Sequence, residues 1–128
     1  MIASIHIHSY LSERYPDVAR EVLDKFRSMK CNPKVIRSVY NKAAEMMEER
    51  WEIQVVTIAA SLLLCSPETI FVNSAVRRSS GVATAAGKVL GISQVSVSKK
   101  VDRARHYYTH VAWCRDAVDK IVKEVRGE

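Results

Sequence analysis

Apolar residues recur every three or four positions along most of the chain, a spacing typical of amphipathic helices. One such stripe crosses residues 17–30. A second helix is predicted to begin at Asn32 and Pro33, because an asparagine oxygen caps a first turn and a proline ring suits it. Its stripe continues to Trp51, and we expect all of its members to be core: Ile36, Val39, Tyr40, Ala43, Met47 and Trp51.

The segment from Ile53 to Cys65 is apolar on all sides rather than on one. A helix of this kind has to be enclosed by other helices, so it is predicted to form the centre of the fold, with Ser66 and Pro67 ending it. The chain has 128 residues, of which 48% are hydrophobic and 27% charged, a balance that suits one globular domain. We therefore predict an all-α fold, a single helical bundle around a central apolar helix.

Residues 82–103 have the spacing of a helix-turn-helix. Small residues let two helices approach closely, and Gly91 lets the chain reverse between them because glycine adopts positive φ at little cost. Ser93 is placed to cap the second helix. The small residues are Ala83, Ala85, Ala86 and Gly87, and the apolar anchors are Val89, Leu90, Ile92, Val97 and Val101.

The chain has no glycine or proline between Ile92 and Gly127. Either the second motif helix runs on into a long C-terminal helix, or it breaks near Thr109. The apolar side of the C-terminal helix either packs on its own domain or pairs with a second copy of the chain to form a homodimer. The predicted organisation is an N-terminal arm (1–15), a three-helix core (16–65), the helix-turn-helix (82–103) and a C-terminal helix (104–126).

The positive charge is concentrated around the helix-turn-helix. Residues 77–105 carry seven basic side chains and one acidic one, which accounts for the whole net charge of +6. A basic stripe on such a motif is typical of phosphate binding and predicts sequence-specific binding to double-stranded DNA. The candidate DNA-binding residues are Gln94, Val95, Ser98, Lys99, Lys100 and Arg103 on the second helix, with Arg77, Arg78 and Lys88 beside it.

Other chemistry is weakly indicated. His106 and His110 share a helix face, but two histidines alone do not make a metal site, so no metal or cofactor is expected. No glycine-rich phosphate loop is present, and Asp102 is the only acidic residue near the basic segment, which argues against an enzyme. Three distant cysteines, Cys31, Cys65 and Cys114, suggest reduced thiols in a cytoplasmic protein, and no segment reaches the roughly 20 apolar residues of a membrane span.

The order of these elements resembles one cyclin-box repeat of the transcription factor B family, over roughly Pro16 to Tyr108. The resemblance rests on the segments NPKVIRSVYNKAAEMMEE, VVTIAASLLLC and LGISQVSVSKKV, of which the last is the most specific. It implies that Gln94, Ser98, Lys99 and Lys100 face DNA. Family members have two repeats and a zinc ribbon, whereas this chain has room for one repeat, no CxxC pair and about a dozen additional residues around 67–80.

The resemblance and the charge together favour a small DNA-binding transcription regulator. The alternative is a cyclin-like module that binds a protein of the transcription machinery without contacting DNA directly. A further possibility for the motif itself is a helical hairpin that binds nothing, since a GIS turn also occurs in such hairpins. Salt-dependent DNA binding distinguishes the first of these hypotheses from the other two.

Overall fold

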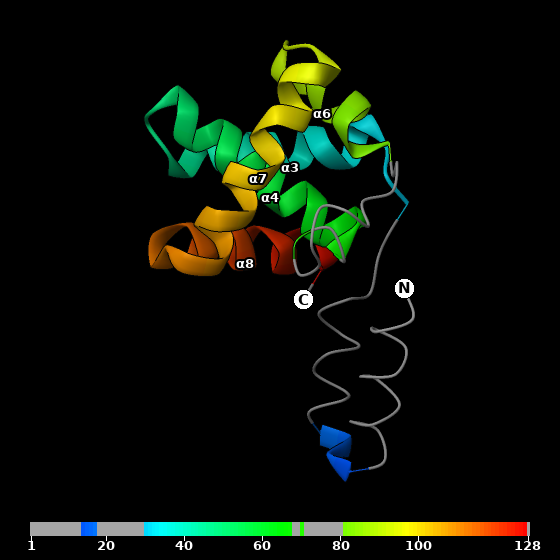
Figure 1. Cartoon of the computed structure of the whole chain (residues 1–128), viewed down its shortest axis with the longest axis vertical. Helices are drawn as coiled ribbons and strands as arrows, with labels where there is room; N and C mark the ends of the chain where they lie inside the picture. Colours follow the sequence, from blue (N-terminus) through cyan, green and yellow to red (C-terminus); the bar gives the residue numbers. More distant parts are fainter. Residues whose placement is uncertain (1–13, 18–29, 68–69, 71–80, 128) are drawn as a thin grey trace.

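The computed structural model describes residues 14–17, 30–67, 70 and 81–127, and five helices are defined there (Figure 1). Within these ranges no β-strand occurs, which confirms the predicted all-α class. The helices are α3 (Pro33–Met46), α4 (Arg50–Cys65), α6 (Val82–Leu90), α7 (Gln94–His110) and α8 (Ala112–Arg126).

The helix α4 forms the centre of the bundle, as its sequence predicts. The other four helices all pack against it, and they also pack against one another in the order α3, α6, α7, α8 and back to α3. Every residue of α4 from Val55 to Leu64 is buried. A helix that is apolar all round is stable only in such an environment, because each of its sides removes hydrocarbon from water.

The helix α3 begins as predicted. The Asn32 side chain accepts a hydrogen bond of 3.0 Å from the backbone N–H of Val35, and Pro33 occupies the first turn. The buried side of α3 is formed by Ile36, Val39 and Ala43, which face the core.

The predicted continuation of the α3 stripe to Trp51 is wrong. The helix ends at Met46, and α4 starts at Arg50 with a capping box in which Glu49 and Glu52 bond each other's backbone N–H groups. This cap restarts the helix in a new direction, so Trp51 stands in the first turn of α4 and is 37% exposed. Met47 packs partly against the core, whereas Trp51 lies outside it.

The C-terminal part consists of two helices rather than one. The backbone of Val111 is extended, with φ −115° and ψ 114°, and it separates α7 from α8 (Figure 1). The break lies two residues from Thr109, so the alternative of a continuous helix is wrong. The apolar side of α8 packs on α3, α4 and α7 of the same chain through Cys114, Ala117, Val118, Ile121 and Val122.

Several sequence predictions fall on residues that lie outside the described ranges. They are the arm at 1–15 and the helix at 17–30, apart from a few described residues, and the connection that carries Arg77 and Arg78. In the part of the chain that the structure does describe, no helix is both long enough and apolar enough to cross a membrane.

Candidate nucleic-acid interface

The helices α6 and α7 are joined by a tight turn at the predicted position. Gly91 ends α6 with φ 72°, a left-handed conformation that favours glycine, and the Ile92 N–H donates a hydrogen bond of 3.0 Å to the Gly87 carbonyl. Ser93 then caps α7, because its hydroxyl accepts a hydrogen bond of 3.1 Å from the backbone N–H of Ser96. These caps fix where α7 begins and therefore which of its side chains face outward.

The small residues of α6 allow the close approach that the sequence predicts. Ala85, Ala86 and Gly87 are buried, and a Cβ atom on Gly87 would lie 2.8 Å from the carbonyl oxygen of Ile92. On the α7 side, Val97 and Val101 are buried and hold the helix against the bundle. The two helices and their turn are therefore one packed unit.

The outward face of α7 carries most of the predicted DNA-binding residues. We use the term recognition face for Gln94, Val95, Ser98 and Lys99. Val95 is 63% exposed, the largest exposure among the large hydrophobic residues in the described ranges. Gln94 and Lys99 are also exposed, and Ser98 is half-buried beside them. An exposed valine contributes little to the hydrophobic core.

The other predicted residues surround this face. Lys88 is exposed in the last turn of α6, Lys100 is half-buried on α7, and Arg103 is exposed one turn beyond Lys99. Arg105, which was not a candidate, is turned inward: its Nε donates to the carbonyl of Ile70 at 3.2 Å and it pairs with Asp102 at 3.4 Å. Arg77 and Arg78 lie outside the described residues.

Three aromatic rings meet beside Arg103, and the sequence analysis missed them. The aromatic cluster consists of Trp51 of α4, Tyr107 of α7 and Trp113 of α8, with ring centroids 5.7, 5.9 and 6.0 Å apart. The guanidinium of Arg103 lies 5.2 Å from the Trp51 ring centroid and 5.7 Å from that of Tyr107. Only the i,i+4 pair of Arg103 and Tyr107 was visible in the sequence, because the tryptophans come from other helices.

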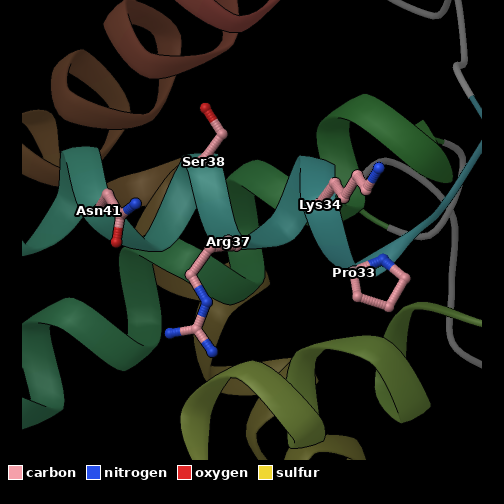
Figure 2. A pocket seen from close by; sticks show the side chains of 5 residues that line it. All are labelled: Pro33, Lys34, Arg37, Ser38 and Asn41. Atoms are coloured by element: carbon pink, nitrogen blue, oxygen red, sulfur yellow. The ribbon is translucent and has the colours of Figure 1, made fainter.

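A second basic feature lies on α3. A shallow, open pocket is lined along one side of this helix by Pro33, Lys34, Arg37, Ser38 and Asn41 (Figure 2). Arg37 also lies 5.7 Å from the centroid of the Tyr40 ring. Both cationic side chains are exposed, and the five lining residues belong to a single helix, so the pocket does not enclose a small ligand.

The histidine pair and the cysteines are the candidate metal ligands that the sequence offers in the described residues. The rings of His106 and His110 stack with centroids 4.7 Å apart, as their spacing predicts, but no group of three or more ligating side chains occurs among the described residues. The thiols of Cys31 and Cys65, although 34 positions apart, lie close enough for each to influence the pKa of the other, and all three cysteines are free. Burial raises the pKa of Cys65 to about 12 and that of Cys114 to about 11, so both thiols are protonated at neutral pH.

No protein-family model matches this chain, and no curated protein or solved structure is significantly similar to it. The resemblance to the transcription factor B family therefore stays a prediction based on the order and spacing of residues.

Proposed function

We propose that this protein binds double-stranded DNA through α6 and α7 and regulates transcription. The observation that supports this most strongly is the recognition face, where Gln94, Val95 and Lys99 are exposed directly after a capped turn, within the segment that carries the net charge of +6. A helix presented in this way fits the major groove, which admits one α-helix.

The residue types on this face suit a division between base and phosphate contacts. A glutamine such as Gln94 bonds adenine with two hydrogen bonds, and a valine such as Val95 makes apolar contact with the thymine methyl group. Lys99, Lys100 and Lys88 neutralise phosphates, as do Arg77 and Arg78 in the segment before α6. The resemblance further suggests an accessory regulator with a single cyclin-like repeat, acting in the cytoplasm, where the free thiols stay reduced.

The test is binding to random-sequence duplex DNA across a salt series, followed by selection of the bound sequences. We expect the logarithm of the association constant, log K, to fall linearly with the logarithm of the salt concentration. The expected slope is roughly −3 to −5, since each phosphate contact releases about 0.9 counterion. An enriched sequence would support specific recognition, and a twofold-symmetric one would add a homodimer. No binding at low salt would overturn the proposal.

A second candidate function is a protein-interaction module of a transcription complex. It is favoured by the aromatic cluster, since Trp51 and Trp113 are both 37% exposed and Arg103 lies beside them. Tryptophan, tyrosine and arginine are the residues enriched at the energetic centres of protein interfaces. This function predicts no salt-dependent binding to DNA.

A further inference from the structure

The arrangement of Arg103 on the aromatic cluster differs from that of an ordinary surface arginine. Its guanidinium is held near two ring faces at once, at 5.2 and 5.7 Å from their centroids. The rings of Trp51 and Tyr107 also contact Trp113, so α4, α7 and α8 each contribute one ring to the cluster beside Arg103. A cation over aromatic faces is attracted by the negative potential of the rings, which restricts the conformations of the long side chain.

A guanidinium carries five N–H donors in a planar fork, and a cation–π contact leaves donors available for an oxyanion. In the part of the chain that the structure describes, Arg103 forms no ion pair with a carboxylate, whereas Arg105 on the same helix is paired with Asp102. Arg103 is thus oriented by the rings and still able to bind an oxyanion with two parallel hydrogen bonds.

Arg103 lies two helical turns beyond the first turn of α7. Val95, Lys99 and Arg103 follow one another at four-residue intervals on the same side of the helix. At about 1.5 Å per residue, Arg103 lies about 12 Å along the axis from Val95. A recognition helix reads base edges with its N-terminal residues, so Arg103, two turns further along α7, is placed beyond the base-reading turn and is suited to a backbone phosphate.

We propose that the aromatic cluster is a positioning platform that holds Arg103 for a backbone phosphate of the bound duplex. This inference rests on the proposed function and extends it beyond the recognition face. Arg103 makes the contact, while Trp51 and Tyr107 act through it by fixing its orientation. A contact that is ordered before binding loses less side-chain entropy on association, so the platform strengthens binding without adding charge.

The test compares four variants in duplex binding at several salt concentrations. Arg103→Ala removes both the positive charge and the proposed phosphate contact. We therefore expect about a tenfold loss of affinity for the duplex near 0.1 M salt, and a slope of log K against log salt that is smaller in magnitude by about 0.9. Arg103→Lys and Trp51→Leu keep the positive charge, so we expect the slope to be retained while affinity falls several-fold. Lys120→Ala is the control, because it removes one exposed positive charge on α8, which does not border α6.

Tryptophan fluorescence gives an independent readout. The chain has two tryptophans, and both belong to the aromatic cluster. We expect their emission to change during a duplex titration with the same midpoint as the binding curve.

The outcomes separate the two proposals. If the unmodified protein does not bind duplex DNA, the proposed function fails and this inference fails with it. If it binds, but Trp51→Leu retains the affinity of the unmodified protein, or Arg103→Ala retains the affinity and the salt slope of Lys120→Ala, only the platform is overturned. That second result would favour a protein partner for the aromatic cluster. Circular dichroism of each variant checks that the helices remain folded.

Discussion

Gly87 and Ile92 approach each other so closely that there is no space for a side chain at position 87. A Cβ atom there would lie 2.8 Å from the carbonyl oxygen of Ile92, a distance that requires the backbone to shift. The same two residues are joined by the hydrogen bond from the Ile92 N–H to the Gly87 carbonyl, at 3.0 Å. This contact fixes the turn after α6 and so the position of α7.

Replacing Gly87 by alanine is therefore expected to destabilise the protein, although alanine favours helix by about 1 kcal/mol in an open position. Overpacking of this kind costs about 1 to 3 kcal/mol, so we expect a lower free energy of unfolding in urea. Thr84→Ala is the matched control, since Thr84 is exposed on the same helix. Equal or greater stability for Gly87→Ala would show that the turn adjusts without cost.

Local chemistry explains why much of the fold was predictable from the sequence. The Asn32 and Ser93 caps, the glycine turn at Gly91 and the enclosed helix α4 all depend on residues that are close together in the chain. Capping and periodicity act over a few residues, so their effects are visible in a single sequence. The outward position of Gln94, Val95 and Lys99 on α7 followed from the same information.

The features that the sequence did not reveal depend on contacts between distant elements. The aromatic cluster needs α4, α7 and α8 to meet, and the pair of Cys31 and Cys65 joins the segment before α3 to the end of α4. The misplacement of Trp51 has a local cause instead. Its i,i+4 spacing from Met47 continues the apolar stripe, whereas the start of α4 is set by the capping box that Glu49 and Glu52 form.

The hydroxyl of Tyr108 ties α7 to α8. It donates a hydrogen bond of 2.7 Å to Oδ1 of Asp119, and Tyr108 as a whole is only 3% exposed. Because a hydrogen bond to a carboxylate contributes about 1.5 to 3 kcal/mol, and water partly replaces it at a half-buried aspartate, Tyr108→Phe is expected to lower the free energy of unfolding by about 1 to 2 kcal/mol.

Tyr107→Phe provides the comparison for this measurement. Tyr107 is the neighbouring tyrosine, its ring stays in the aromatic cluster after the change, and its hydroxyl forms no hydrogen bond among the described residues. Urea unfolding of both variants isolates the contribution of the Tyr108 hydroxyl. Identical stabilities would indicate that the bond to Asp119 adds nothing net.

Because two thiols are buried, the free energy of unfolding is expected to fall as the pH becomes alkaline. Burial raises the pKa of Cys65 to about 12 and that of Cys114 to about 11, from an ordinary value of 9.0. The unfolded chain therefore loses these thiol protons at a lower pH than the folded protein does. The contribution of the two thiols to stability is complete below pH 9, and it is lost as the pH rises towards their pKa values in the folded protein. Between about pH 9 and 11 we expect each thiol to lower the free energy of unfolding by at most about 1.4 kcal/mol per pH unit.

Other groups also titrate in this range, so the control is a variant without the two thiols. Cys65→Ala combined with Cys114→Ala is expected to be less stable at pH 8 but to lose stability less steeply above pH 9. Urea unfolding at intervals of pH gives both curves. If the free energies of unfolding of the variant and the unmodified protein changed with pH in parallel, these thiols would have the same pKa values in the folded and unfolded chains.

The proposed function assigns base and phosphate contacts to different residues of α7, and these are expected to respond differently to substitution. Lys99→Ala combined with Lys100→Ala should weaken binding to every duplex and reduce the salt slope by at most about two units. Lys120→Ala combined with Lys123→Ala is the matched control, because it removes the same charge from exposed positions on α8. If the two double variants behave alike, net charge alone drives binding and the face of α7 has no special role.

Gln94→Ala removes no charge, so its effect should appear in specificity. At the first turn of α7, the Gln94 side chain is exposed and next to Val95, where it would meet a base edge before any phosphate. Losing two hydrogen bonds to adenine is expected to reduce discrimination at one base pair by about 1 to 3 kcal/mol, with the salt slope unchanged. Competition between selected duplexes that differ at single positions measures this. An equal loss of affinity on all of them would contradict a base contact, because a side chain that only supports the backbone contact cannot distinguish one base pair from another.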